Sequence, residues 1–81
     1  MSLNTMVEVR ATRSCAINYL QQHYPATAGK LRFRPKPVQR EVHGYGFIWT
    51  FSVQLVSEDK ARQVEVLIDY TNGVSSVLSV R

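Results

Sequence analysis

The sequence predicts an α+β fold in which one N-terminal helix packs on a curled, four-stranded antiparallel sheet. Three observations support this fold. Apolar side chains recur at every second position along residues 47–55, 64–70 and 74–80, which is the period of strands with one buried face. Residues 6–23 instead repeat their apolar side chains at helical spacing. No crossover helix lies between the strand segments, so the sheet is expected to be antiparallel.

The helix is expected to run from about Met6 to His23. Thr5 and Glu8 have the spacing of a capping box, in which a hydroxyl and a carboxylate bond to the free N–H groups of the first turn. Pro25 prevents the helix from continuing. The stripe expected to face the sheet consists of Val9, Ala16, Ile17, Leu20 and Tyr24.

The start of this helix has an alternative. Thr12 and Ser14 are weaker helix formers, so the helix could begin later and leave residues 4–11 as an arm. Residues 1–5 are expected to be disordered or to come from cloning. The chain as a whole, residues 1–81, is predicted to form a single domain.

The stretch after the helix predicts a short, irregular edge strand. Apolar and basic side chains alternate over residues 31–34, but Pro35 and Pro37 cannot donate backbone hydrogen bonds. Extended structure is expected to resume over residues 38–42, and residues 43–46 contain the glycines of a turn.

The remaining three strands are predicted to form a meander. A polar loop at residues 57–60 joins the first two, and residues 71–73, Thr-Asn-Gly, suit the positive φ angles of a tight hairpin before the last. The alternating sets are Phe47, Trp49, Phe51, Val53 and Leu55, then Val64, Val66, Ile68 and Tyr70, then Val74, Ser76, Leu78 and Val80. Trp49 is therefore expected in the core.

Length and composition limit the possible classes of protein. With 81 residues and 44% hydrophobic side chains, the chain resembles a globular domain near the lower size limit for a single core. Its apolar runs are far shorter than the roughly 20 residues of a membrane span, so no membrane insertion is expected. The N-terminus lacks the pattern of a signal peptide, which slightly favours the cytoplasm. Cys15 is the only cysteine, which excludes an internal disulfide and a cysteine-based zinc site.

Positive charge is concentrated in one stretch. The net charge is +4, and five of the ten basic residues lie between residues 30 and 40 with no acid among them: Lys30, Arg32, Arg34, Lys36 and Arg40. Strand alternation would turn the first four of these side chains to one face. Such a row could discourage aggregation of a strand edge, bind an acidic protein, or follow the phosphates of a nucleic acid while Tyr45 stacks on bases.

The order of elements resembles a known family. A helix with an Ala-Ile pair, an aromatic-led strand, a polar loop and a valine-rich hairpin follow one another over residues 14–80, as in the PepSY domain. The residues that carry the resemblance are Asp69, Asn72, Gly73, Val77, Leu78 and Val80. The resemblance implies a cystatin-like helix-on-sheet fold and inhibition or regulation of a protease or cell-envelope partner. It also implies a location outside the cytoplasm and no catalytic residues.

The chain departs from the PepSY pattern in two respects. It carries the basic, proline-containing stretch at residues 30–40, and it shows no export signal. Residues 45–49, Tyr-Gly-Phe-Ile-Trp, also make it similar to small bacterial immunity-type proteins, which pair an N-terminal helix with a glycine-aromatic strand.

Residues that could support catalysis do not form a recognisable site. Cys15, Tyr19 and His23 stand four apart in one helical column, but the first and last are two turns, about 12 Å, apart, too far to activate a thiolate. His43 lies in the predicted turn. The six acidic residues show neither calcium-loop spacing nor a catalytic pair and are expected to be solvated. No enzymatic activity, cofactor or metal site is therefore predicted.

These observations predict a small non-catalytic module that binds, inhibits or regulates another protein. Its contact surface is predicted to combine the basic edge with the outer face of the aromatic strand. That surface comprises Lys30, Arg32, Arg34, Lys36, Arg40, Tyr45, Thr50, Ser52 and Gln54. A partner's strand could add to the irregular edge, or the domain could form a homodimer there. The alternative is an accessory domain that binds nucleic acid through the same basic stretch.

Overall fold

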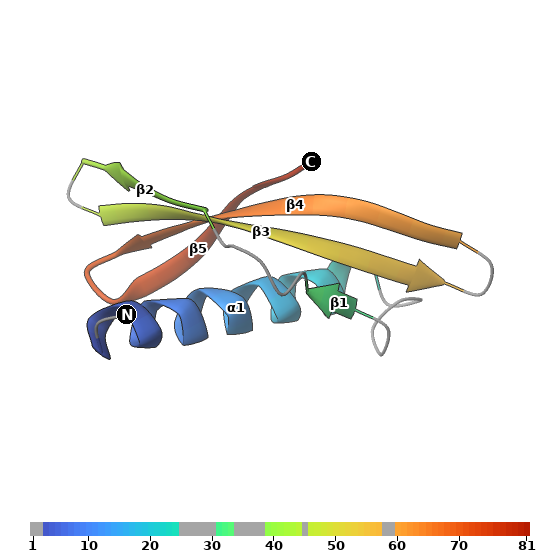
Figure 1. The fold of residues 1–81 in the computed structure, drawn as a ribbon, viewed down its shortest axis with the longest axis horizontal. Coiled ribbons are helices and arrows are strands. Elements are labelled where there is room, and N and C mark those ends of the chain that lie inside the picture. The colour runs from blue at the N-terminus through green and yellow to red at the C-terminus, as the bar shows by residue number, and fades with distance from the viewer. Residues whose placement is uncertain (1–2, 25–30, 34–38, 45, 58–59) are drawn as a thin grey trace.

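The computed structural model describes residues 3–24, 31–33, 39–44, 46–57 and 60–81. Figure 1 shows one helix lying along one face of an open antiparallel sheet, so the predicted α+β, helix-on-sheet fold is confirmed. The elements are α1 (Leu3–His23), β1 (Leu31–Phe33), β2 (Gln39–His43), β3 (Gly46–Ser57), β4 (Lys60–Thr71) and β5 (Val74–Val80). The strand order is β1-β3-β4-β5, and β2 also pairs with β3.

The sheet has five strands because the predicted irregular strand is divided in two. β1 pairs with the far end of β3, where Leu31 lies opposite Leu55 and Phe33 opposite Val53. β2 pairs with the other end of the same edge, from Gln39 to His43. The two prolines between them lie outside the described residues.

The long hairpin of β3 and β4 forms the centre of the sheet. Its pairing runs from Phe47 opposite Tyr70 to Ser57 opposite Lys60. The tight turn predicted before β5 is confirmed, because Asn72 and Gly73 have φ angles of 52° and 77°. Positive φ at two successive residues matches the right-handed twist of the flanking strands.

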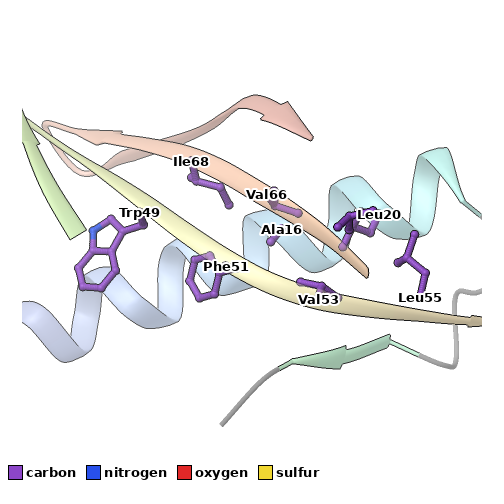
Figure 2. Packing of buried hydrophobic residues seen from close by; sticks show 9 residues of the cluster. Ala16, Leu20, Trp49, Phe51, Val53, Leu55, Val66 and Ile68 are labelled. Atoms are coloured by element: carbon purple, nitrogen blue, oxygen red, sulfur yellow. The ribbon is translucent and has the colours of Figure 1, made fainter. Parts of the chain in front are cut away.

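The core lies between α1 and the sheet, and the predicted alternation along β3 and β4 is confirmed. Trp49 is 3% exposed, so its predicted core position is confirmed as well. Figure 2 shows the labelled side chains of β3 and β4 on the side of the sheet that faces the helix, together with Ala16 and Leu20 of α1. The buried apolar set is Ala16, Leu20, Trp49, Phe51, Val53, Leu55, Val64, Val66 and Ile68. Burying each of the large side chains is worth roughly 1.5–3 kcal/mol.

The period predicted for β5 is correct, but its phase is wrong from Val74 to Leu78. The hairpin turn places Ser75 opposite Tyr70 and Val77 opposite Ile68, so these residues face the helix. Val74 and Leu78 are instead 64% and 53% exposed.

A bulge then restores the predicted phase at the end of β5. Leu67 pairs with Ser79 while Ile68 pairs with Val77, which leaves Leu78 as the extra residue. Val80 consequently lies opposite the buried Val66 and packs against the core.

The helix begins earlier than predicted. It starts at Leu3, so Thr5 lies within it rather than capping it, and the alternative arm at residues 4–11 is wrong. Residues 3–5 are helical rather than disordered, whereas residues 1 and 2 lie outside the described part. Thr12 does not interrupt the helix, and its buried hydroxyl donates a hydrogen bond to the carbonyl oxygen of Glu8 at 2.7 Å.

Among the described residues, no helix combines the length and apolar character that a membrane span requires.

Candidate interaction surface

The outer face of the sheet is the face turned away from α1, and none of the described elements covers it (Figure 1). Residues directly opposite in an antiparallel pair share a face. Gln54 lies opposite Arg32 of β1 on one side and Gln63 of β4 on the other. Ser52 lies opposite Glu65 in the next row, which makes this part of the face polar.

Arg32 is the described residue that joins the basic edge to the outer face. It is exposed on β1, between two partly buried residues, Leu31 and Phe33, that pack against the core. Phe33 lies edge-on to the buried Phe51, with ring centroids 5.8 Å apart. The inward anchoring of its neighbours holds Arg32 beside Gln54.

Arg40 does not belong to this surface, although it was predicted to. Its register position opposite Trp49 places it on the helix side of the sheet. The guanidinium carbon lies 3.4 Å from the ring centroid of Phe47 and 5.6 Å from that of Trp49. One guanidinium nitrogen, Nη2, lies 3.4 Å from Oε2 of Glu8. Cation–π contact and ion pairing therefore hold this cation on the helix side of the sheet, where its side chain remains 35% exposed.

Glu8 is buried rather than solvated, which corrects the prediction for the acidic residues. It is 7% exposed, and its Oε1 accepts a hydrogen bond from Nε1 of Trp49 at 3.4 Å. Its Oε2 accepts one from Arg40. A signal for this position exists in the sequence, because Glu8 precedes the buried Thr12, Ala16 and Leu20 at four-residue intervals.

Four predicted surface residues lie outside the described part of the chain: Lys30, Arg34, Lys36 and Tyr45. The described members of the predicted set are thus divided. Arg32, Thr50, Ser52 and Gln54 share the outer face, and Arg40 lies on the other side.

A groove beside α1 was not predicted from the sequence. It has a volume of about 560 Å³ and is lined by one flank of the helix and by Val77 of β5. The helix residues are Ala11, Ser14, Cys15, Asn18, Tyr19 and Gln22. None of these side chains is charged. The out-of-phase placement of β5 is what brings Val77 to the groove.

The helix residues that were considered for catalysis make packing contacts. Tyr19 stacks on His23, with ring centroids 4.1 Å apart, while Cys15 packs against the core. Burial raises the pKa of the Cys15 thiol above its usual value, which disfavours the reactive thiolate. His43 is exposed at the end of β2. Within the described ranges, no group of three or more His, Cys, Asp or Glu residues could hold a metal ion.

Comparison with models of protein families, with curated proteins and with solved structures finds no match to this chain. The resemblance to the PepSY domain and the similarity to immunity-type proteins therefore stay predictions.

Proposed function

We propose that this chain is a small non-catalytic module that binds and regulates another protein through the outer face of its sheet. The proposed contact surface comprises Arg32, Gln54, Ser52 and Thr50. The observation that supports it is the register that places the exposed Arg32 directly beside Gln54. A partner with an acidic, hydrogen-bonding surface fits this chemistry.

The rigidity of the sheet supports the same function. Each outer residue of β3 alternates with a buried one, so the core fixes the positions of Thr50, Ser52 and Gln54. A backbone that is already ordered loses little further conformational entropy when its side chains bind a partner. One arginine near polar side chains resembles the polar rim of an interface, where charge mainly affects association rate and specificity.

Charge reversal tests this proposal. Arg32→Glu should weaken capture of the partner by about tenfold, because it places a negative charge against an acidic surface. Arg62→Glu is the matched control, since Arg62 is exposed on β4 but lies opposite Leu55, in the inward-facing register. The measurement is quantitative pull-down with the immobilised chain. Captured proteins that bind Arg32→Glu as well as they bind wild type would disprove the proposal.

Nucleic-acid binding through the basic stretch is the rival function, and the position of Arg40 leaves that stretch with one cation fewer. That arginine is engaged with Glu8 and two aromatic rings, so it does not extend the row of cations. A titration with a single-stranded oligonucleotide at low and high salt separates the two functions. Binding that weakens steeply with salt would favour the rival, because each phosphate contact contributes about −0.7 to the salt slope.

The regulatory role suggested by the PepSY resemblance is part of the same proposal. The resemblance implies that the partner is a protease or a cell-envelope protein. Identification of the captured partner by mass spectrometry, with Arg32→Glu as the negative control, tests that narrower statement.

A further inference from the structure

We propose that β5 is a homodimer interface, through which two copies of this chain join their sheets edge to edge about a two-fold axis beside Ser76. This edge lies across the sheet from β1 and β2, where sequence analysis placed the self-pairing. Pairing through β5 does not involve the outer-face residues of the proposed function.

Charge distinguishes β5 from the other edge strands. β1 contains Arg32, and β2 contains Arg40 and Glu41, whereas β5 has no charged residue from Val74 to Val80. Proteins commonly protect an open strand edge with charges, prolines or bulges; β5 has no charge and no proline, and its bulge at Leu78 leaves Val74–Val77 in regular pairing with β4. Because the chain carries a net charge of +4, two copies approach most easily where no basic residue enters the contact. A neutral edge therefore suits a second copy better than it suits an acidic partner.

The exposed apolar side chains of β5 determine the register. Antiparallel pairing centred on Ser76 places Val74 of each copy opposite Leu78 of the other, so the contact forms twice. These side chains are more than half exposed in the single chain. Pairing centred on Ser75 or on Val77 would instead place Val74 or Leu78 opposite a serine. The Ser76 register thus removes the most apolar surface from water, at about 25 cal/mol per Å².

The groove beside α1 also favours a second copy of this chain as the partner. A two-fold axis perpendicular to the sheet places both helices on one face, so the α1 flank next to Val77 turns toward the other copy. That flank carries the small, uncharged Ala11, Ser14 and Cys15. Val7, one helical turn before Ala11, is 52% exposed. Small residues permit helix axes to approach to about 8–10 Å, so a second α1 can cover the groove.

The mass in solution is the first test. Wild-type chain at about 100 µM should show twice the 9.2 kDa mass of one chain by size exclusion with light scattering. Leu78→Arg should restore the single-chain mass, because it places a cation against the apolar pair. Val42→Arg is the matched control, since Val42 is 77% exposed on β2, and it should keep the dimer.

Cross-linking tests the register and does not require a dissociating variant. In Ser76→Cys, the two introduced thiols would lie on residues whose Cα atoms are about 4.5–5.5 Å apart, within the range of a disulfide. In Ser79→Cys, the corresponding residues would be six positions apart along the pair, about 20 Å. In chains that also carry Cys15→Ser, so that the native thiol of the groove cannot contribute, mild oxidation should therefore link Ser76→Cys into dimers, whereas Ser79→Cys should stay at a low baseline.

Three results would overturn the proposal: a wild-type mass of one chain at this concentration, dissociation by Val42→Arg but not by Leu78→Arg, or equal cross-linking of the two cysteine variants. Arg32→Glu should keep the double mass, so loss of the outer-face function and loss of the dimer are distinguishable.

Discussion

At the scale of single residues, Glu8 connects the helix to two strands. Its two carboxylate oxygens accept hydrogen bonds from Trp49 of β3 and Arg40 of β2. A buried carboxylate is costly unless it is paired, so these contacts make the position tolerable. The same contacts explain why Arg40 lies on the helix side of the sheet rather than on the predicted basic surface.

We expect Glu8→Ala to lower the free energy of unfolding by about 1–3 kcal/mol, because Trp49 Nε1–H loses its buried acceptor. Urea unfolding followed by the fluorescence of Trp49, the only tryptophan, measures this change. Glu65→Ala is the control, since Glu65 is exposed on β4 and its loss should change stability by less than about 0.5 kcal/mol. Equal unfolding midpoints for the two variants would contradict the assigned role of Glu8.

Cys15 gives a pH-dependent prediction. Since burial raises the pKa of this thiol, the folded chain should hold less thiolate at a given pH than the unfolded chain does. Alkylation by iodoacetamide should accordingly reach half its maximal rate at a higher pH in the folded protein than in urea. The urea sample is the internal control. A folded-state midpoint at or below the unfolded one would contradict the desolvated position of Cys15.

At the scale of elements, two glycines near the start of β3 are needed for different reasons. Gly44 has a φ of 61°, with open space around its Cα. A Cβ on Gly46 would instead meet the hydroxyl of Thr71 and the backbone carbonyl of Tyr70. The backbone of β4 cannot move aside without disturbing its pairing with β3.

We expect Gly46→Ala to destabilise the fold by more than Gly44→Ala. The first substitution introduces overlap with backbone, which typically costs about 1–3 kcal/mol or more. The second meets only the strain of a left-handed conformation, about 1–2 kcal/mol. Thermal unfolding of both variants measures the difference. A lower melting temperature for Gly44→Ala would refute this comparison.

Some features of these elements could be predicted from the sequence, and others could not. Strands β3 and β4 were predictable because each has one strongly apolar face, and the Asn72–Gly73 turn has a characteristic composition. The phase of β5 was not predictable, since serines and valines occupy both of its faces and the bulge at Leu78 changes the register. The outer-face residues followed from alternation along β3. The inward position of Arg40 did not, because it depends on Glu8, which lies 32 residues away in sequence.

At the scale of the whole molecule, the fold is elongated, with extents of 41 × 22 × 18 Å. The β3–β4 hairpin spans the sheet, whereas β5 pairs with β4 only from Val66 to Thr71 (Figure 1). The molecule therefore has two dissimilar sides. One edge carries Arg32 and Arg40, whereas on the opposite side β5 carries no charged residue from Val74 to Val80.

The division of the first edge into β1 and β2 limits how far such molecules can assemble. A strand that docked on that side would meet two short segments of three and five residues rather than one continuous row of backbone groups. Growth of a fibre requires a usable template at both ends of every subunit. The short, charged segments β1 and β2 therefore disfavour strand addition on that side, so a pair joined through β5, as proposed above, should not grow further there.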